Sequence, residues 1–164
     1  MKYLLVFLAL FAGCATMQAV PTPANILLGP NPQFETLPAF NKLKNLSADT
    51  QEYEAAKVQY LLDRMSKSPY VFLRNNLKYN GRKAAVHLKW KYYKNYKTAP
   101  SAELFISRLT TSKQSGEPYY LQIGDKAYRC SEIFRNELSL LDQALANNGM
   151  PSRKAAGIQE KDVT

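Results

Sequence analysis

The sequence is poor in the residue types that build the most common metal and disulfide sites. Its 164 residues include one histidine, His87, and two cysteines, Cys14 and Cys130. A structural zinc site takes several Cys or His ligands at defined spacing, and a disulfide framework takes at least four cysteines. These counts exclude multi-histidine zinc sites, paired C-x-x-C motifs and a disulfide scaffold, and we predict neither a metal nor a cofactor.

Acidic residues are also scarce, because 13 Asp and Glu stand against 22 Lys and Arg, a net charge of +9. The chain is nevertheless 46% hydrophobic and 21% charged, which is typical of a globular domain rather than of a disordered or fibrous chain. We therefore expect one compact domain.

The N-terminus has the layout of a secretory signal. Lys2 precedes an apolar run over Tyr3–Phe11, which is too short to span a bilayer, and the small residues Ala12 and Gly13 lead to Cys14. Small residues directly before a cysteine resemble a bacterial lipobox, in which cleavage exposes that cysteine as a lipidated N-terminus. We predict a lipoprotein-type signal peptide over residues 1–14, with Cys14 as the lipidation site that holds the protein on a membrane.

Cleavage by ordinary signal peptidase after Ala19 is the alternative, although Met17-Gln18-Ala19 is a poorer match to the A-x-A pattern. The residue after the cysteine is Ala15 rather than Asp, which resembles Gram-negative lipoproteins that are sorted to the outer membrane. The expected location is the periplasm, with the protein anchored to the outer membrane of a Gram-negative bacterium.

Residues 15–40 contain five prolines and show little periodicity, which predicts an extended, semi-rigid tether. A polyproline-like chain rises about 3.1 Å per residue, so this tether would reach about 80 Å and hold the folded part away from the membrane. The alternative is that Ile26, Leu27 and Leu28 dock on the domain as a short strand or an apolar plug.

Residues 41–149 have the pattern of a single α+β domain, with four helices packed around a small antiparallel sheet made of two hairpins. Caps, apolar spacing and breakers predict helices that begin within Asp49–Glu52, near Gly81 with Asn80 as the cap, within Pro100–Glu103, and after Ser131 as the cap. The third helix is expected to be broken off only at Ser115–Pro118. The turns of the hairpins are Asn75-Asn76 and Gly124-Asp125, and the second suits type II′. The polar tail over residues 150–164 is expected to be flexible.

Several segments keep an ordered spacing along the domain: Phe72-Leu73-Arg74-Asn75, Ala84 through His87-Leu88, Lys91, Ser101–Ile106, Ser112 and Ser115–Tyr119. Over about Tyr53–Leu138 this pattern resembles the YfeK-like family of small exported bacterial proteins. The resemblance implies export and a compact domain. That family is uncharacterised, so the resemblance supplies no reaction.

Charge is concentrated in one segment, because Lys57–Lys97 holds eleven basic residues and a single acidic one, Asp63. Within it, Lys89–Lys97 interleaves cations with aromatic residues, a composition typical of a surface that meets phosphate, carboxylate or lipid headgroups. At helical spacing, His87, Lys91 and Lys94 form a polar stripe. Val86, Trp90 and Tyr93 form a second arc beside it, which either covers another element or is an exposed aromatic ledge.

His87 is the one side chain whose unperturbed pKa lies near neutrality. One hypothesis groups Arg74, His87 and Lys91 as an anion pocket, with Ser112, Ser115 and the Gly116 N–H as donors. The alternative has His87 bonded to a loop carbonyl and Arg74 bracing the first hairpin. The residues predicted to bind a ligand are Arg74, His87, Lys89, Trp90, Lys91, Tyr93, Lys94, Ser112 and Ser115.

Other candidate chemistries are weaker. A Ser–His–Asp site lacks a nucleophile-elbow sequence, and Cys130 is expected to be inert packing at the end of a strand. The carboxylates of two helices, Glu52 with Glu54 and Glu132 with Glu137, are expected at first turns and on the solvent side, where they serve capping and solubility.

These features favour a lipid-anchored, non-enzymatic binding or adaptor domain. Its expected partner is an anionic envelope component, namely a lipid phosphate, lipopolysaccharide or peptidoglycan, or else an acidic protein, whereas nucleic acid does not fit an exported lipoprotein. Two alternatives stay open: a small envelope enzyme that uses His87 with Arg74 and Lys91 on an anionic substrate, and a structural lipoprotein whose charges serve solubility.

Overall fold

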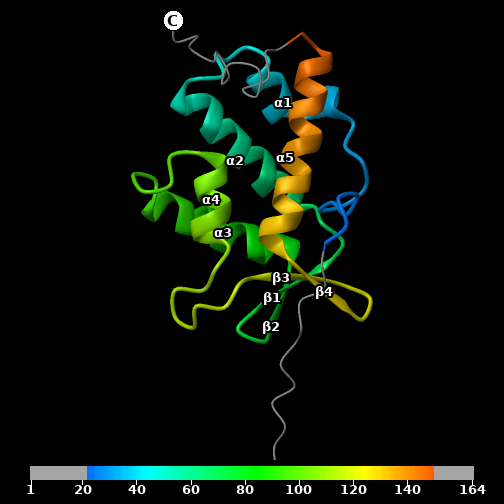
Figure 1. The fold of residues 1–164 in the computed structure, drawn as a ribbon, viewed down its shortest axis with the longest axis vertical. Coiled ribbons are helices and arrows are strands. Elements are labelled where there is room, and N and C mark those ends of the chain that lie inside the picture. The colour runs from blue at the N-terminus through cyan, green and yellow to red at the C-terminus, as the bar shows by residue number, and fades with distance from the viewer. Residues whose placement is uncertain (1–21, 150–164) are drawn as a thin grey trace, which may run out of the picture.

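Two β-hairpins join into one four-stranded antiparallel sheet in the computed structural model, which describes residues 22–149 (Figure 1). The sheet order is β2-β1-β3-β4, because β1 pairs with both β2 and β3. The strands are β1 (Val71–Arg74), β2 (Leu77–Asn80), β3 (Tyr120–Ile123) and β4 (Lys126–Arg129). The predicted signal peptide with Cys14 and the predicted tail over residues 150–164 lie outside the described residues.

The two hairpin turns have the predicted backbone conformations. Asn75 and Asn76 have φ of 49° and 60°, and a two-residue type I′ turn requires positive φ at both positions. Gly124 has φ of 60° while Asp125 does not share the positive φ, which agrees with type II′. The α+β class and both hairpins are thus confirmed.

Four longer helices supply most of the core: α2 (Gln51–Ser66), α3 (Gly81–Lys94), α4 (Ala102–Leu109) and α5 (Cys130–Asn147). The first three begin with side-chain caps, in which Thr50, Asn80 and Ser101 each accept a backbone N–H from three residues further on. Within residues 22–149 no helix is long and apolar enough to cross a membrane.

Two predicted helix boundaries were wrong. The last helix begins at Cys130 with no side-chain cap, because the Cys130 N–H donates to the Tyr119 carbonyl and the chain passes directly from strand to helix, so Ser131 is not the cap. The third helix ends at Leu109, well before Ser115, because the chain turns back on itself: the Tyr119 N–H donates to the Thr110 carbonyl, and the Ser112 N–H donates to the Glu117 carbonyl.

The predicted tether is corrected over its described part, because the chain packs on the domain from Thr22 onward. The Thr22 N–H donates to Glu132 of α5, and Asn136 of α5 donates to the carbonyls of Pro23 and Ile26. Leu28 is 0% exposed, so the apolar-plug alternative describes this segment. A 3-10 turn over Phe34–Thr36 and a fifth helix, α1 (Pro38–Leu43), follow, and α1 packs on α2.

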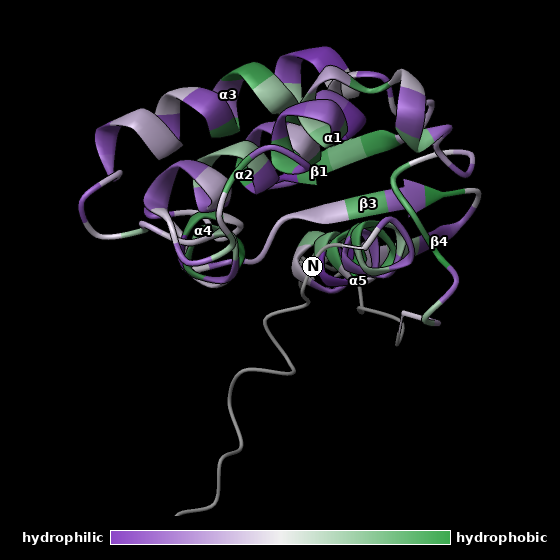
Figure 2. Cartoon of the chain, turned by 90° about the horizontal axis from the view of Figure 1, so that it is seen from above, coloured by the Kyte–Doolittle hydropathy of each residue, from purple (hydrophilic) through white to green (hydrophobic). Residues whose placement is uncertain are grey.

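The sheet lies between helices on both of its faces. Figure 2 shows β1 and β3 with α3 on one side and α5 on the other. Phe105 of α4 and Phe134 of α5 stack with ring centroids 6.1 Å apart in the core. The segment that begins at Thr22 therefore joins the domain on the α5 side, and α3 lies on the opposite side of the sheet.

Glu137, expected on the solvent side of α5, is 0% exposed. It lies four residues from both Ile133 and Leu141, so helical periodicity puts it on the buried face. Its carboxylate accepts hydrogen bonds from Arg64, from the Tyr60 hydroxyl and from the Leu28 N–H, at 2.7–3.2 Å. This buried network joins α5 to α2 and holds the N-terminal segment.

Glu54 lies in the first turn of α2, as predicted, but it does not serve solubility, because it is buried. Its carboxylate accepts the Ala102 N–H at 2.8 Å, which satisfies a backbone donor at the start of α4.

We predict that Glu137→Ala lowers the free energy of unfolding by about 3–5 kcal/mol, because it leaves the Arg64 charge and two further donors without their acceptor. Urea unfolding of the purified full chain measures this loss. Glu103→Ala is the matched control, since its ion pair with Arg135 is exposed and such pairs contribute less than about 1 kcal/mol. Equal, small losses in the two variants would contradict a stabilising role for the Glu137 network.

Candidate functional site

Helix α3 carries most of the predicted site, and its position is set by a close approach to α2. The helix begins at Gly81, where an added Cβ would lie 2.2 Å from the Met65 carbonyl oxygen of α2. Only glycine allows the start of α3 to pass the end of α2 at this distance. Ala84, Ala85, Leu88 and Tyr92 are then buried, which leaves the opposite face of α3 to solvent.

That outer face presents three large apolar side chains in a row. Val86, Trp90 and Tyr93 lie at helical spacing and are 64%, 55% and 66% exposed. Of the two alternatives for this arc, the structure shows the exposed one. We call these three residues the aromatic ledge.

Cations surround the aromatic ledge. The Lys94 ammonium lies 4.3 Å from the centroid of the Trp90 ring, a cation–π contact, and Lys89 is exposed beside it. α3 itself contains no acidic residue. None of the ion pairs found in residues 22–149 includes a cation of α3, so the charge of this face is not neutralised by a carboxylate.

A groove of about 520 Å³ runs beside the aromatic ledge, between α3 and the pair α1 and α2. α2 lines it with small and apolar side chains, including Ala55, Val58 and Leu62. α3 contributes Lys89, Tyr92 and Tyr93, and Tyr96 lies two residues beyond the end of the helix. This face of the domain therefore combines an apolar groove with lysines.

Lys91 does not belong to the exposed stripe predicted for it, because it is only 5% exposed. Its ammonium donates to the carbonyl oxygens of Leu109, at 2.8 Å, and Thr111, and lies 3.4 Å from the Tyr119 hydroxyl. The loop over residues 110–119 folds across it, an arrangement that helical periodicity alone does not show. Burial, with the nearby charges of Lys113 and Arg74, lowers the pKa of Lys91 to about 8.

Arg74, His87 and Lys91 do converge, and they meet at Tyr119. His87 Nε2 lies 3.3 Å from the Tyr119 hydroxyl oxygen, and the Lys91 ammonium and Arg74 guanidinium lie 5.0 and 5.9 Å from the centroid of its ring. The hydrogen-bond partner of His87 is thus a tyrosine hydroxyl rather than a loop carbonyl. Sequence reasoning gave Tyr119 to a strand and missed this role, although Tyr119 follows the breaker Glu117-Pro118 directly.

The predicted serine donors have other partners. Ser115 Oγ donates to Asn75 Oδ1 at 2.8 Å, and the Gly116 N–H donates to the Ser112 carbonyl at 2.9 Å. Ser112 is buried, and its hydroxyl accepts the Ser115 N–H. The Ser115 contact ties the 110–119 loop to the turn of the first hairpin, and the Ser112 contacts lie within the loop.

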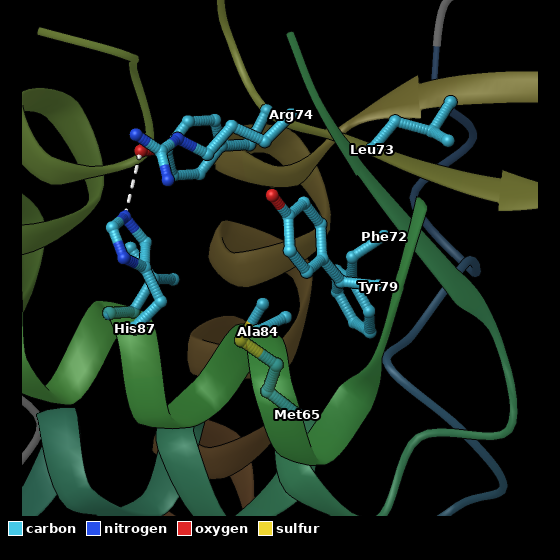
Figure 3. A pocket seen from close by; sticks show the side chains of 9 residues that line it. Met65, Phe72, Leu73, Arg74, Tyr79, Ala84 and His87 are labelled. Carbon is cyan, nitrogen blue, oxygen red and sulfur yellow. Dashed lines mark hydrogen bonds between the residues drawn. The ribbon is translucent and has the colours of Figure 1, made fainter. Parts of the chain in front are cut away.

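A small pocket of about 80 Å³ opens beside this cluster, between β1 and α3 (Figure 3). Arg74 and His87 point toward each other at one end of it, and Phe72, Tyr79, Ala84 and Met65 line the remainder. Partial burial, then the charges of Arg74 and Lys91, lower the pKa of His87 below the ordinary value for histidine. The cluster is a region of positive potential next to an apolar cavity.

Comparison with known protein families assigns this chain to one of them. The pattern of a family of unknown function, DUF5329, matches residues 52–142, more than half of the chain. The chain belongs to the DUF5329 family. The matched part runs from the start of α2 into α5, so it contains the aromatic ledge, the Tyr119 cluster and the pocket. This agrees with the expectation of an uncharacterised domain family. No curated protein and no solved structure matches the chain.

We predict that the single histidine of this DUF5329 protein titrates below pH 6.5 in the folded state, which NMR of its ring protons measures directly. Because the folded protein then binds fewer protons than the unfolded chain, the free energy of unfolding falls as the pH falls from about 6.5 through the folded pKa. His87→Gln removes this part of the pH dependence. A folded pKa above 6.5 would contradict the positive environment described here.

Proposed function

We propose that this protein is an exported, lipid-anchored adaptor of the bacterial envelope, and that the exposed face of α3 binds an acidic partner protein. The observation that supports the proposal is the row of exposed Val86, Trp90 and Tyr93 on a helix whose neighbouring cations have no carboxylate partners within the described residues. The export part of the proposal is supported by the signal-like N-terminus and by the resemblance to YfeK-like exported proteins.

The chemistry of this face fits a protein partner better than a uniformly charged polymer. Protein interfaces have an apolar core in which Trp and Tyr are enriched, surrounded by a polar rim. The aromatic ledge supplies such a core, Lys89 and Lys94 supply a basic rim, and the adjoining groove offers room for an apolar segment. A partner that complements this face carries apolar side chains flanked by Asp or Glu.

The packed N-terminal segment also shortens the length of chain that would connect Cys14 to the domain. Seven residues separate Cys14 from Thr22, where the packed chain begins, and seven residues span at most about 25–30 Å. Thr22 contacts α5, on the other side of the sheet from α3 (Figure 2). A lipid on Cys14 would hold the α5 side close to the membrane and leave α3 accessible to a partner. On this view the protein does not stand 80 Å from the bilayer.

Photocrosslinking in cells tests whether an acidic protein contacts the exposed face of α3. With a photoreactive amino acid at Val86, we expect a crosslink to a protein whose contacting segment is acidic, and we expect none from the same amino acid at Lys126 on β4. Crosslinks to lipid or to glycan alone, or identical products from both positions, would contradict the proposal.

The affinity of the identified partner for the purified full chain and its variants measures how much each residue contributes to binding. Trp90→Ala should weaken it roughly 10- to 30-fold, as expected for an aromatic residue at the centre of an interface. The double variant Lys89→Gln, Lys94→Gln should reduce both the affinity and its salt dependence, because dissolved salt screens the exposed ion pairs that these lysines form with the partner. Lys126→Gln with Arg129→Gln removes the same charge from β4 and should change neither. A structural lipoprotein would show no difference among these variants.

We predict that labelled palmitate is incorporated into the full chain and is lost in Cys14→Ser. Lipobox cleavage makes Cys14 the mature N-terminus, so N-terminal analysis should find a blocked, lipidated cysteine. An unlabelled protein that begins at Val20 would instead show ordinary signal peptidase cleavage after Ala19.

A further inference from the structure

The pocket between β1 and α3 has two chemically different ends, and neither belongs to the aromatic ledge. Its apolar wall comes from Met65, Phe72, Leu73, Ala84 and Leu88. Its polar end holds Arg74 and His87, and His87 contacts the Tyr119 hydroxyl. Figure 3 shows that the Tyr79 hydroxyl also points into the pocket toward Arg74. At about 80 Å³, the pocket exceeds several-fold the roughly 10–15 Å³ that one water molecule needs.

The polar end lacks a negative charge. Arg74 Nε is buried and has no hydrogen-bond partner among the described residues, although buried polar atoms are normally paired. Lys91 adds a second, buried positive charge behind the Tyr119 ring. No ion pair within residues 22–149 joins either cation to a carboxylate. An anion at this end would satisfy an open donor and reduce the repulsion between Arg74 and Lys91.

We propose that this pocket binds a small monocarboxylate with a short apolar group. The carboxylate accepts hydrogen bonds from the Arg74 guanidinium and from the Tyr119 hydroxyl, whose oxygen in turn accepts from His87 Nε2–H, and the apolar group lies against Phe72, Leu73 and Leu88.

Two features favour a carboxylate over inorganic phosphate. A guanidinium donates two parallel hydrogen bonds to the two oxygens of a carboxylate, which leaves the remainder of the molecule free of charge. Phosphate carries polar oxygens on every side, and the apolar wall would leave some of them without donors. The size of the cavity limits the apolar group to a few carbon atoms.

The single histidine supplies the test, because its ring protons report on the pocket without labelling. The charged and titratable groups around His87 are Arg74 from β1, Lys91 from α3 and Tyr119 from the loop before β3, with Trp90 stacked at 6.2 Å. Since bound carboxylate adds a negative charge among these groups, it should raise the pKa of His87.

The experiment titrates the full chain with isobutyrate, with isobutyramide as a neutral probe of the same shape, and with inorganic phosphate. We expect saturable shifts of the His87 signals, and a higher His87 pKa, with isobutyrate at millimolar concentrations. Isobutyramide should bind at least tenfold more weakly, and phosphate should not saturate. No saturable shift with isobutyrate, or equal binding of the amide, would overturn the proposal.

Variants assign the effect to the pocket. Arg74→Gln should weaken isobutyrate binding about tenfold or more, as expected for loss of a charge-assisted hydrogen bond. Arg74→Lys keeps the positive charge but loses the two parallel N–H groups of the guanidinium, so this variant should keep only part of the affinity for isobutyrate. Ala84→Leu fills the apolar end and should abolish binding while Arg74 is intact.

Lys89→Gln separates this proposal from the adaptor proposal. This change on the outer face of α3 should weaken partner binding and leave isobutyrate binding unchanged. Trp90→Ala does not serve this purpose, because the Trp90 ring stacks on His87. Isobutyrate binding and partner binding are therefore measured separately, and the failure of one proposal is distinguishable from the failure of the other. Unchanged isobutyrate binding in folded Arg74→Gln and Ala84→Leu proteins would overturn the assignment to this pocket.

Discussion

The ammonium of Lys91 holds the candidate site together, because it is the point where α3, the end of α4 and the 110–119 loop meet. It donates to the carbonyl of Leu109, the last residue of α4, and to the carbonyl of Thr111 in the loop that follows. The loop held in this way brings Tyr119 over His87 and Arg74. Buried cations of this kind are stable only when several oxygen acceptors surround them, so the charge constrains the fold of the loop as well as its own surroundings.

A second buried charge, Glu137, acts on the other side of the sheet. It gathers Arg64, Tyr60 and the Leu28 N–H around one carboxylate, and so decides where the N-terminal segment lies. Together the two charges divide the domain. Glu137 of α5 holds the N-terminal segment, and Lys91 belongs to α3, the helix that carries the aromatic ledge and lines the pocket. Figure 2 shows these two helices on opposite sides of the sheet.

The positive charge of α3 has two different consequences in the folded protein. On the outer face, Lys89 and Lys94 are solvated and stand beside exposed aromatic rings, an arrangement suited to a large acidic partner. On the inner face, Lys91 of α3 and Arg74 of β1 lie near one tyrosine ring with an apolar cavity beside them, an arrangement suited to a small anion. The outer face of α3 and the pocket that α3 forms with β1 therefore differ in the ligands that suit them.

The α+β class, both hairpin turns, the Asn80 cap and the arc formed by Val86, Trp90 and Tyr93 follow from the amino-acid sequence, because turn residues, caps and helical periodicity act over only a few neighbouring residues. Tertiary packing exposes that arc, buries Lys91 and Glu137, places Leu28 on the domain and joins Tyr119 to His87. Each of these depends on segments far apart in the chain: Leu28 and Glu137 are 109 residues apart, and His87 and Tyr119 are 32 apart. Local pattern carries no information about which distant carbonyl, carboxylate or hydroxyl will meet a given side chain.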